Sequence, residues 1–211
     1  MKNQIFILMM LVASVAKAND RKYYEAVGKH MQVVYTSHSI DELQGATNAL
    51  DRISAAEKSK WESYYYSAFG YLMMANQEGE AARKDSFLDQ ALERVRQAAA
   101  VSPGNAEISA LEGFVHMLRV AIDPASRGQQ YSQLSMQAYG RALQQDPNNP
   151  RALALMAQMQ FGTARFFGSP TTDACGMARK ALDQFNAFKS ENPIAPRWGK
   201  EMTEELLTSC N

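Results

Sequence analysis

The sequence predicts an all-α protein, a right-handed helical-repeat solenoid of about four helix pairs closed by a C-terminal capping helix. Apolar residues recur with helical spacing along the 211-residue chain, and no segment alternates like a half-buried strand. The breaks between helical stretches are also regular, because Pro103, Pro147 and Pro193 stand 44 and 46 positions apart. A fixed period of this length indicates helix pairs that stack on one another.

The composition excludes several classes of protein. With 46% hydrophobic and 21% charged residues, the chain is not intrinsically disordered. Its 22 basic residues are balanced by 22 acidic ones, so it lacks the dense basic surface of a nucleic-acid-binding protein. After the N-terminus no stretch approaches the ~20 apolar residues of a membrane-spanning helix. We therefore predict no nucleic-acid partner and no membrane span in the mature protein.

Residues 1–18 have the pattern of a secretory signal peptide. Lys2 precedes an apolar run at 5–15, and Ala16-Lys17-Ala18 has the small residues that signal peptidase recognises. The alternative is an uncleaved membrane anchor, but a run of about eleven residues is too short to span the bilayer. We expect cleavage after Ala18, a single domain over 19–211, and a periplasmic or secreted location.

The helices are placed by apolar stripes and by the breaks between them. Phe87, Leu88, Leu92 and Val95 form one such stripe, which indicates a partner helix on that side. The expected helices are 21–35, 39–54, 57–76, 84–101, 105–122, 129–146, 150–166, 172–190 and 195–209.

The two cysteines lie in the last two predicted helices. Cys175 is near the start of 172–190, and Cys210 follows the end of 195–209. If these helices are antiparallel, each leg is ~23 Å long and both sulfur atoms reach the same end. An even number of cysteines in an exported chain favours a disulfide. The alternative, a catalytic thiol, needs a positioned base, and no local motif supplies one.

Several motifs resemble the tetratricopeptide repeat (TPR). In 137–150, small Ala138 and Ala142 suit close helix packing and Pro147 ends the helix, as in the second helix of a TPR. The chain is similar to a family of small exported TPR-like proteins of Bacteroidota-type bacteria. This resemblance rests on the order of 61–68, 123–132, 147–151 and 161–168, followed by Trp198-Gly199 and Cys210. It implies a TPR-like domain over 19–211 and no established biochemical activity.

The TPR-like pattern favours a non-enzymatic scaffold that binds a protein or peptide in a concave groove. In such repeats the first helix of each pair faces the groove, which places Arg151, Gln158 and Phe161 there. Tyr65, in the aromatic cluster 61–71, is a further candidate because tyrosine offers a large contact area. The partner is not identified by the sequence, and we expect the protein to be a monomer.

A second hypothesis is a small-ligand-binding protein. Stacking of the pairs could bring Arg127 and Tyr131 of the 123–132 insert close to Phe166 in 161–170, around a pocket for an anionic or peptide group. Alternatively, Arg127 is a structural staple between successive inserts.

The motifs of enzymes are not present. Glu112 and His116 stand four apart on one predicted helical face, but no third metal ligand accompanies them. A solvated or salt-bridged surface explains this pair better. No phosphate-binding glycine loop, nucleophile elbow or dinucleotide fingerprint occurs. We therefore predict no catalytic residue, no metal and no cofactor.

Overall fold

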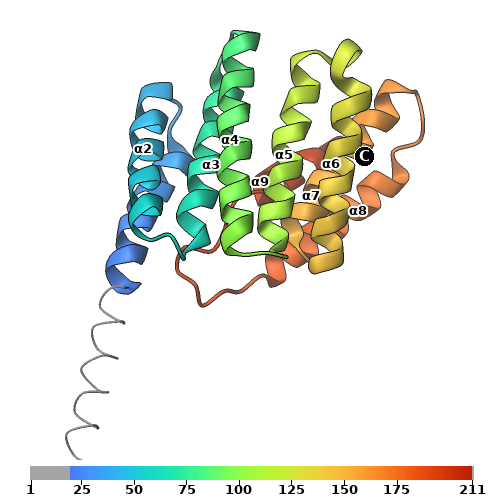
Figure 1. The fold of residues 1–211 in the computed structure, drawn as a ribbon. Coiled ribbons are helices and arrows are strands. Elements are labelled where there is room, and N and C mark those ends of the chain that lie inside the picture. Colours follow the sequence, from blue (N-terminus) through green and yellow to red (C-terminus); the bar gives the residue numbers. More distant parts are fainter. Residues whose placement is uncertain (1–19, 211) are drawn as a thin grey trace, which may run out of the picture.

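The computed structural model describes residues 20–210, and the predicted signal peptide lies outside the described residues. Within this range the regular secondary structure is entirely helical, which confirms the predicted helical-repeat fold class (Figure 1). None of its helices is long and apolar enough to cross a membrane. The helices are the first helix at 20–36, α2 (Ile40–Ala56), α3 (Trp61–Gln77), α4 (Ala81–Val101), α5 (Ala106–Ile122), α6 (Pro124–Gln145), α7 (Pro150–Phe166), α8 (Thr172–Ala187) and α9 (Lys200–Thr208).

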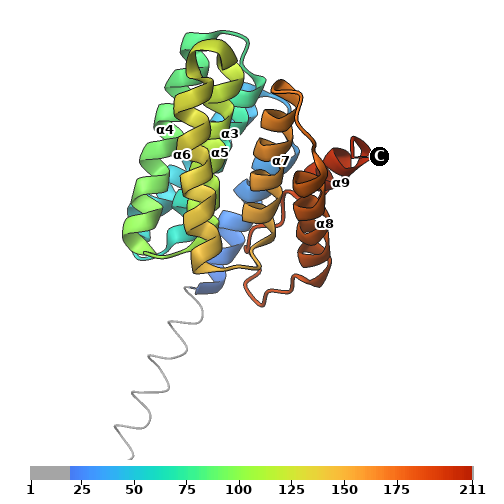
Figure 2. The same cartoon turned by 90° about the vertical axis from the view of Figure 1, so that its right-hand side faces the viewer.

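Successive helices stand side by side in one curved array, with α8 and α9 at its C-terminal end (Figures 1 and 2). Small residues allow the closest approaches. At Gly113 of α5, an added Cβ would lie 2.3 Å from the ring of Tyr139 in α6, so no larger residue fits there without a shift of that ring. Apolar side chains from the first helix through α7 form one continuous core, including Leu43, Leu72, Leu88, Leu111 and Leu155.

The breaks at Pro103 and Pro147 are proline turns followed by asparagine caps, whereas Pro193 lies in a non-helical segment and the next helix begins only at Lys200. The side chain of Asn105 accepts the Glu107 N–H at 3.0 Å, and that of Asn149 accepts the Ala152 N–H at 2.9 Å. Each asparagine thereby satisfies an amide in the first turn of its helix that has no partner within the helix. The 44-residue spacing seen in the sequence is thus the spacing of helix starts.

Three predicted helix starts are wrong. The helix expected from residue 57 begins at Trp61, because 57–60 form a turn. The expected loop at 123–132 is helical from Pro124, because Asp123 is the N-cap and accepts the Ser126 N–H at 3.2 Å. Proline at the first helical position supports this early start. At the other end, 195–199 is not helical. Gly199 has φ of 105°, a left-handed conformation from which α9 then begins.

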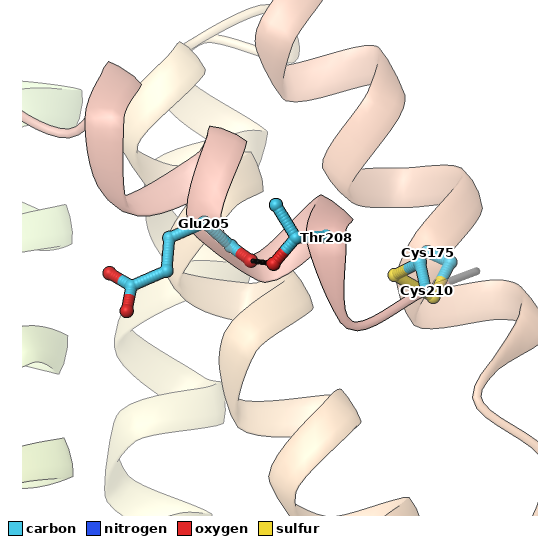
Figure 3. The surroundings of a disulfide bond; sticks show 4 residues. All are labelled: Cys175, Glu205, Thr208 and Cys210. Carbon is cyan, nitrogen blue, oxygen red and sulfur yellow. Dashed lines mark hydrogen bonds between the residues drawn. A yellow bond between two sulfur atoms is a disulfide. The ribbon is translucent and has the colours of Figure 1, made fainter.

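The predicted disulfide between Cys175 and Cys210 is confirmed (Figure 3). Its Cα atoms are 5.8 Å apart, and it joins the start of α8 to the residue that follows α9. Both cysteines pack with Phe161, Ala174 and Leu206 in a small apolar cluster. Because α9 has nine residues and buries only Thr203, the covalent bond adds to the packing of Met202 and Leu206 in holding it against the array.

We expect replacement of both cysteines by alanine to lower the free energy of unfolding by about 2–4 kcal/mol, because the bond closes a 35-residue separation. Urea unfolding followed by circular dichroism measures the change. As a control, a reducing agent should destabilise the wild type and leave the double variant unaffected. Equal unfolding midpoints for the two proteins would contradict a stabilising role.

Candidate functional site

The inner face of the array is covered by the chain itself. We define this face by side chains of the first helix, α3, α5 and α7, namely Tyr35, Glu62, Tyr65, Tyr66, Phe69, Phe114 and Arg151. The non-helical segment 188–199, called the strap below, leaves the end of α8, crosses beneath the array and returns to α9 (Figure 1). It contacts residues up to 162 positions away in sequence.

Trp198 is the main anchor of the strap. Its ring lies between those of Phe69 and Phe114, with centroid distances of 4.9 and 5.6 Å and interplanar angles of 24° and 27°. The indole N–H donates to the Tyr65 hydroxyl at 2.9 Å. Trp198 is therefore buried with its one polar group satisfied, as buried tryptophan requires.

The inner face also binds the polar groups of the strap. The Tyr66 hydroxyl donates to the carbonyl of Ile194 at 2.7 Å, and the Arg197 N–H donates to the Tyr35 hydroxyl at 3.3 Å. The Asn192 side-chain amide donates to Glu62 at 3.0 Å. Side chains thus supply the partners that a non-helical backbone needs when it is buried.

A buried ion pair lies under the strap. Arg151 is fully buried and binds Glu107 through two nitrogens, with Nη2 2.6 Å from Oε1. Asn149 also donates to Glu107, at 2.7 Å, and Arg151 Nη1 donates to the Trp198 carbonyl at 3.5 Å. Burial opposes the charge on Arg151, but the hydrogen bonds and attraction of Glu107 outweigh it and raise the pKa of the guanidinium.

These contacts correct the predicted open groove. Tyr65 and Arg151 are 0% exposed and face the strap, so neither is accessible to a partner in this conformation. Phe161 is also buried, against the disulfide cluster. Of the residues assigned to the groove, only Gln158 is exposed. The difference arises because the strap covers the inner face. Helical periodicity does not predict this covering.

Arg127 is part of an ionic bridge between helices. Its guanidinium binds both carboxylate oxygens of Asp85 in α4, at 2.7 and 2.8 Å. The same contact raises the pKa of Arg127 and lowers that of Asp85. Arg119 of α5 reaches Asp85 and Asp89, at 3.4 and 2.5 Å. The geometry is that of a staple, with its partner on α4 and not in 161–170.

Tyr131 packs in the α5–α6 seam. Its ring stacks on His116 with centroids 6.1 Å apart, and the Arg119 guanidinium carbon lies 5.6 Å from its centre. Glu112 pairs with Arg141 at 2.8 Å. The described interactions of Arg127 and Tyr131 thus involve α4 and α5.

Phe166 and Phe167, the aromatic pair, form the most exposed apolar feature of the described residues. They are 74% and 73% exposed, at the point where α7 ends. Their rings meet edge to face with centroids 5.0 Å apart. Gly168 has φ of 67° and turns the chain away at once. Exposed apolar side chains that lie together are candidates for an interaction site.

No protein-family model matches the chain, and neither does any curated protein. Among solved structures, the fold is similar to the HusA haemophore from Porphyromonas gingivalis, with a TM-score of 0.80 and 26% sequence identity. The match covers 90% of this chain and 92% of the other. Similarity to a haemophore supports a ligand- or protein-binding role and is consistent with export. The narrower TPR-like family is not confirmed by these comparisons.

Sequence reasoning missed Glu107, although a signal existed. Glu107 is two residues after the Asn105 cap and Arg151 two after the Asn149 cap, so they occupy equivalent positions one repeat apart. Stacked repeats bring equivalent positions together, and opposite charges there indicate an ion pair. The sequence signal for the role of Trp198 was weaker. It was the presence of a large aromatic residue in a segment that contains proline and lacks helical spacing.

Removing the charge of Glu107 should strongly destabilise the fold. We expect Glu107→Gln to lower the free energy of unfolding by about 3–5 kcal/mol, since it leaves the Arg151 charge buried and unpaired. In a double-mutant cycle by urea unfolding, Glu107→Gln with Arg151→Met should cost less than the sum of the two single changes. Arg96→Met is the control, because the Arg96–Glu93 pair is exposed and should contribute under ~1 kcal/mol.

His116 should make the fold sensitive to acid. Burial lowers the pKa of His116. The carboxylate of Glu112 opposes this shift, whereas the positive charges of Arg119, Arg141 and Arg96 add to it. Because the folded protein favours neutral imidazole, stability is complete above the unfolded pKa of about 6.5 and is lost as pH falls below it.

The free energy of unfolding of wild type and His116→Gln should therefore be compared at about pH 7.5 and about pH 5.5. We expect the wild type to lose more stability than the variant between these values. His30 is present in both proteins, so its own titration cancels in the comparison. Parallel losses in the two proteins would show that His116 is not responsible.

Proposed function

We propose that this is an exported binding protein that takes up a planar, largely apolar ligand bearing carboxylates, such as haem, and that the aromatic pair is its contact surface. The observation that carries the proposal is the exposure of both rings, 74% and 73%, in a fold similar to that of a haemophore. This develops the small-ligand hypothesis, with the contact moved from a pocket to the surface at the end of α7.

The chemistry around the aromatic pair suits such a ligand. Aromatic rings bind flat apolar molecules by stacking and edge contacts and bury a large area in doing so. Arg165 is exposed directly before the pair, with its guanidinium carbon 5.9 Å from the Phe161 ring beneath. A guanidinium at this place can pair with a ligand carboxylate. Phe161, in the same helix as Phe166, packs against the disulfide cluster.

The other function favoured by the sequence, capture of a protein or peptide in the groove, has less support in this conformation. The strap already occupies the inner face, and its anchor Trp198 is 8% exposed. A partner would therefore have to displace it.

Haem titration followed by its absorbance spectrum tests the proposal. We expect Phe166→Ala with Phe167→Ala to weaken haem binding at least tenfold, because each ring contributes on the order of 1 kcal/mol when covered. Phe188→Ala is a matched control, since Phe188 is also an exposed phenylalanine (38%) but lies at the opposite end of α8. Equal affinities for the wild type and the double variant would refute the site.

A further inference from the structure

One stripe of α7 begins on the inner face and ends at the aromatic pair. Its first residues, Arg151 and Leu155, are buried, at 0% and 1% exposed. Its last residues, Gln158, Gly162 and Phe166, are all exposed, and we call them the open strip. All five residues follow one another at intervals of three or four and therefore share one side of the helix. The last turns of this side of α7 are thus open to solvent.

The open strip lacks a side chain that the two preceding repeats have. Met73, Leu118 and Gly162 occupy the equivalent position, 13 residues after the N-cap, in α3, α5 and α7. Met73 and Leu118 are partly buried and pack against the core. At Gly162 the helix backbone itself is the surface, and an added Cβ would meet no atom within 4 Å.

The fold does not require glycine at position 162. Its backbone is helical and has no positive φ, and no neighbouring group excludes a larger residue. Glycine within a helix is also less favourable than alanine. A further use of glycine in proteins is to let a ligand approach the backbone closely. The glycine is therefore explained by a molecule that lies against this side of α7.

The groups along the open strip match a flat ligand with polar edges. From Gln158 to Phe166 the strip is about 12 Å long, at 1.5 Å per residue. The Phe166 ring, 74% exposed, lies at one end, and the Gln158 amide, which can donate and accept hydrogen bonds, lies at the other. Between them, Gly162 presents no side chain that would hold a flat ring system away from the helix.

We propose that Gly162 determines the shape of ligand that the aromatic pair accepts. One face of the planar ligand lies on the α7 backbone at Gly162, one edge contacts Phe166, and a polar substituent is within reach of Gln158. This inference rests on the proposed function and adds to it a selection for planarity. An apolar ligand that is not flat cannot contact the helix backbone and the Phe166 ring together.

The test is haem titration of Gly162→Leu, which introduces the residue that α5 has at the equivalent position. We expect haem to bind at least tenfold more weakly, because the new side chain lifts the ligand off the helix. Gly162→Ala should give a smaller loss of affinity. The direction of the change is informative, since on a merely apolar patch leucine would add contact area and strengthen binding. The thermal unfolding midpoint should not fall, because the site has room for a side chain.

Gly45→Leu is the matched control. Gly45 of α2 is exposed, and an added Cβ there would also meet no atom within 4 Å. No aromatic residue stands three or four positions from it, so we expect unchanged haem affinity.

The two proposals fail in different ways. If Gly162→Leu binds haem as tightly as the wild type while the Phe166→Ala, Phe167→Ala variant loses binding, Gly162 has no role and the aromatic pair remains the site. If the phenylalanine variant binds haem like the wild type, the proposed contact surface is wrong.

Discussion

The ion pair between Arg151 and Glu107 is the contact on which the inner face depends. The Arg151 guanidinium is 0% exposed, and its charge is stabilised by the Glu107 carboxylate and the Trp198 carbonyl. Asn149 also donates to Glu107 and holds that carboxylate in place. The pair joins the first turns of α5 and α7, and Arg151 then reaches the strap at Trp198. Attraction between two charges therefore fixes the spacing of neighbouring repeats and places the anchor of the C-terminal segment.

The same position is used along the array. Glu62, Glu107 and Arg151 are each two residues after the cap of their helices, and all three point to the inner face. Glu62 binds Asn192 of the strap, while the other two bind each other. One repeated position thus supplies both the contact between repeats and the contact with the covering segment.

The inner face and the aromatic pair differ in their exposure to solvent. The inner face is closed by the strap and satisfied in its polar contacts, whereas the aromatic pair is exposed beside a covalently fixed corner. The salt bridges of Arg127 and Arg119 stabilise the array between α4 and α6 and belong to neither surface.

Local sequence signals predicted the helices well. Apolar periodicity, proline turns and asparagine caps act within one helix, so the fold class and most boundaries followed from them. The disulfide followed as well, because two antiparallel helices of similar length bring both cysteines to one end. The start of α6 was misplaced because the capping of Pro124–Ser126 by Asp123 was overlooked.

The sequence by itself determined a helical repeat, its period and its disulfide, because these depend on local spacing. Only the tertiary structure decided that Tyr65 and Arg151 are covered and that Phe166 and Phe167 are exposed. Such differences depend on where the strap crosses the array, and its contacts join residues as far as 162 positions apart. Periodicity specifies which face of a helix is apolar, but not which distant segment packs against that face.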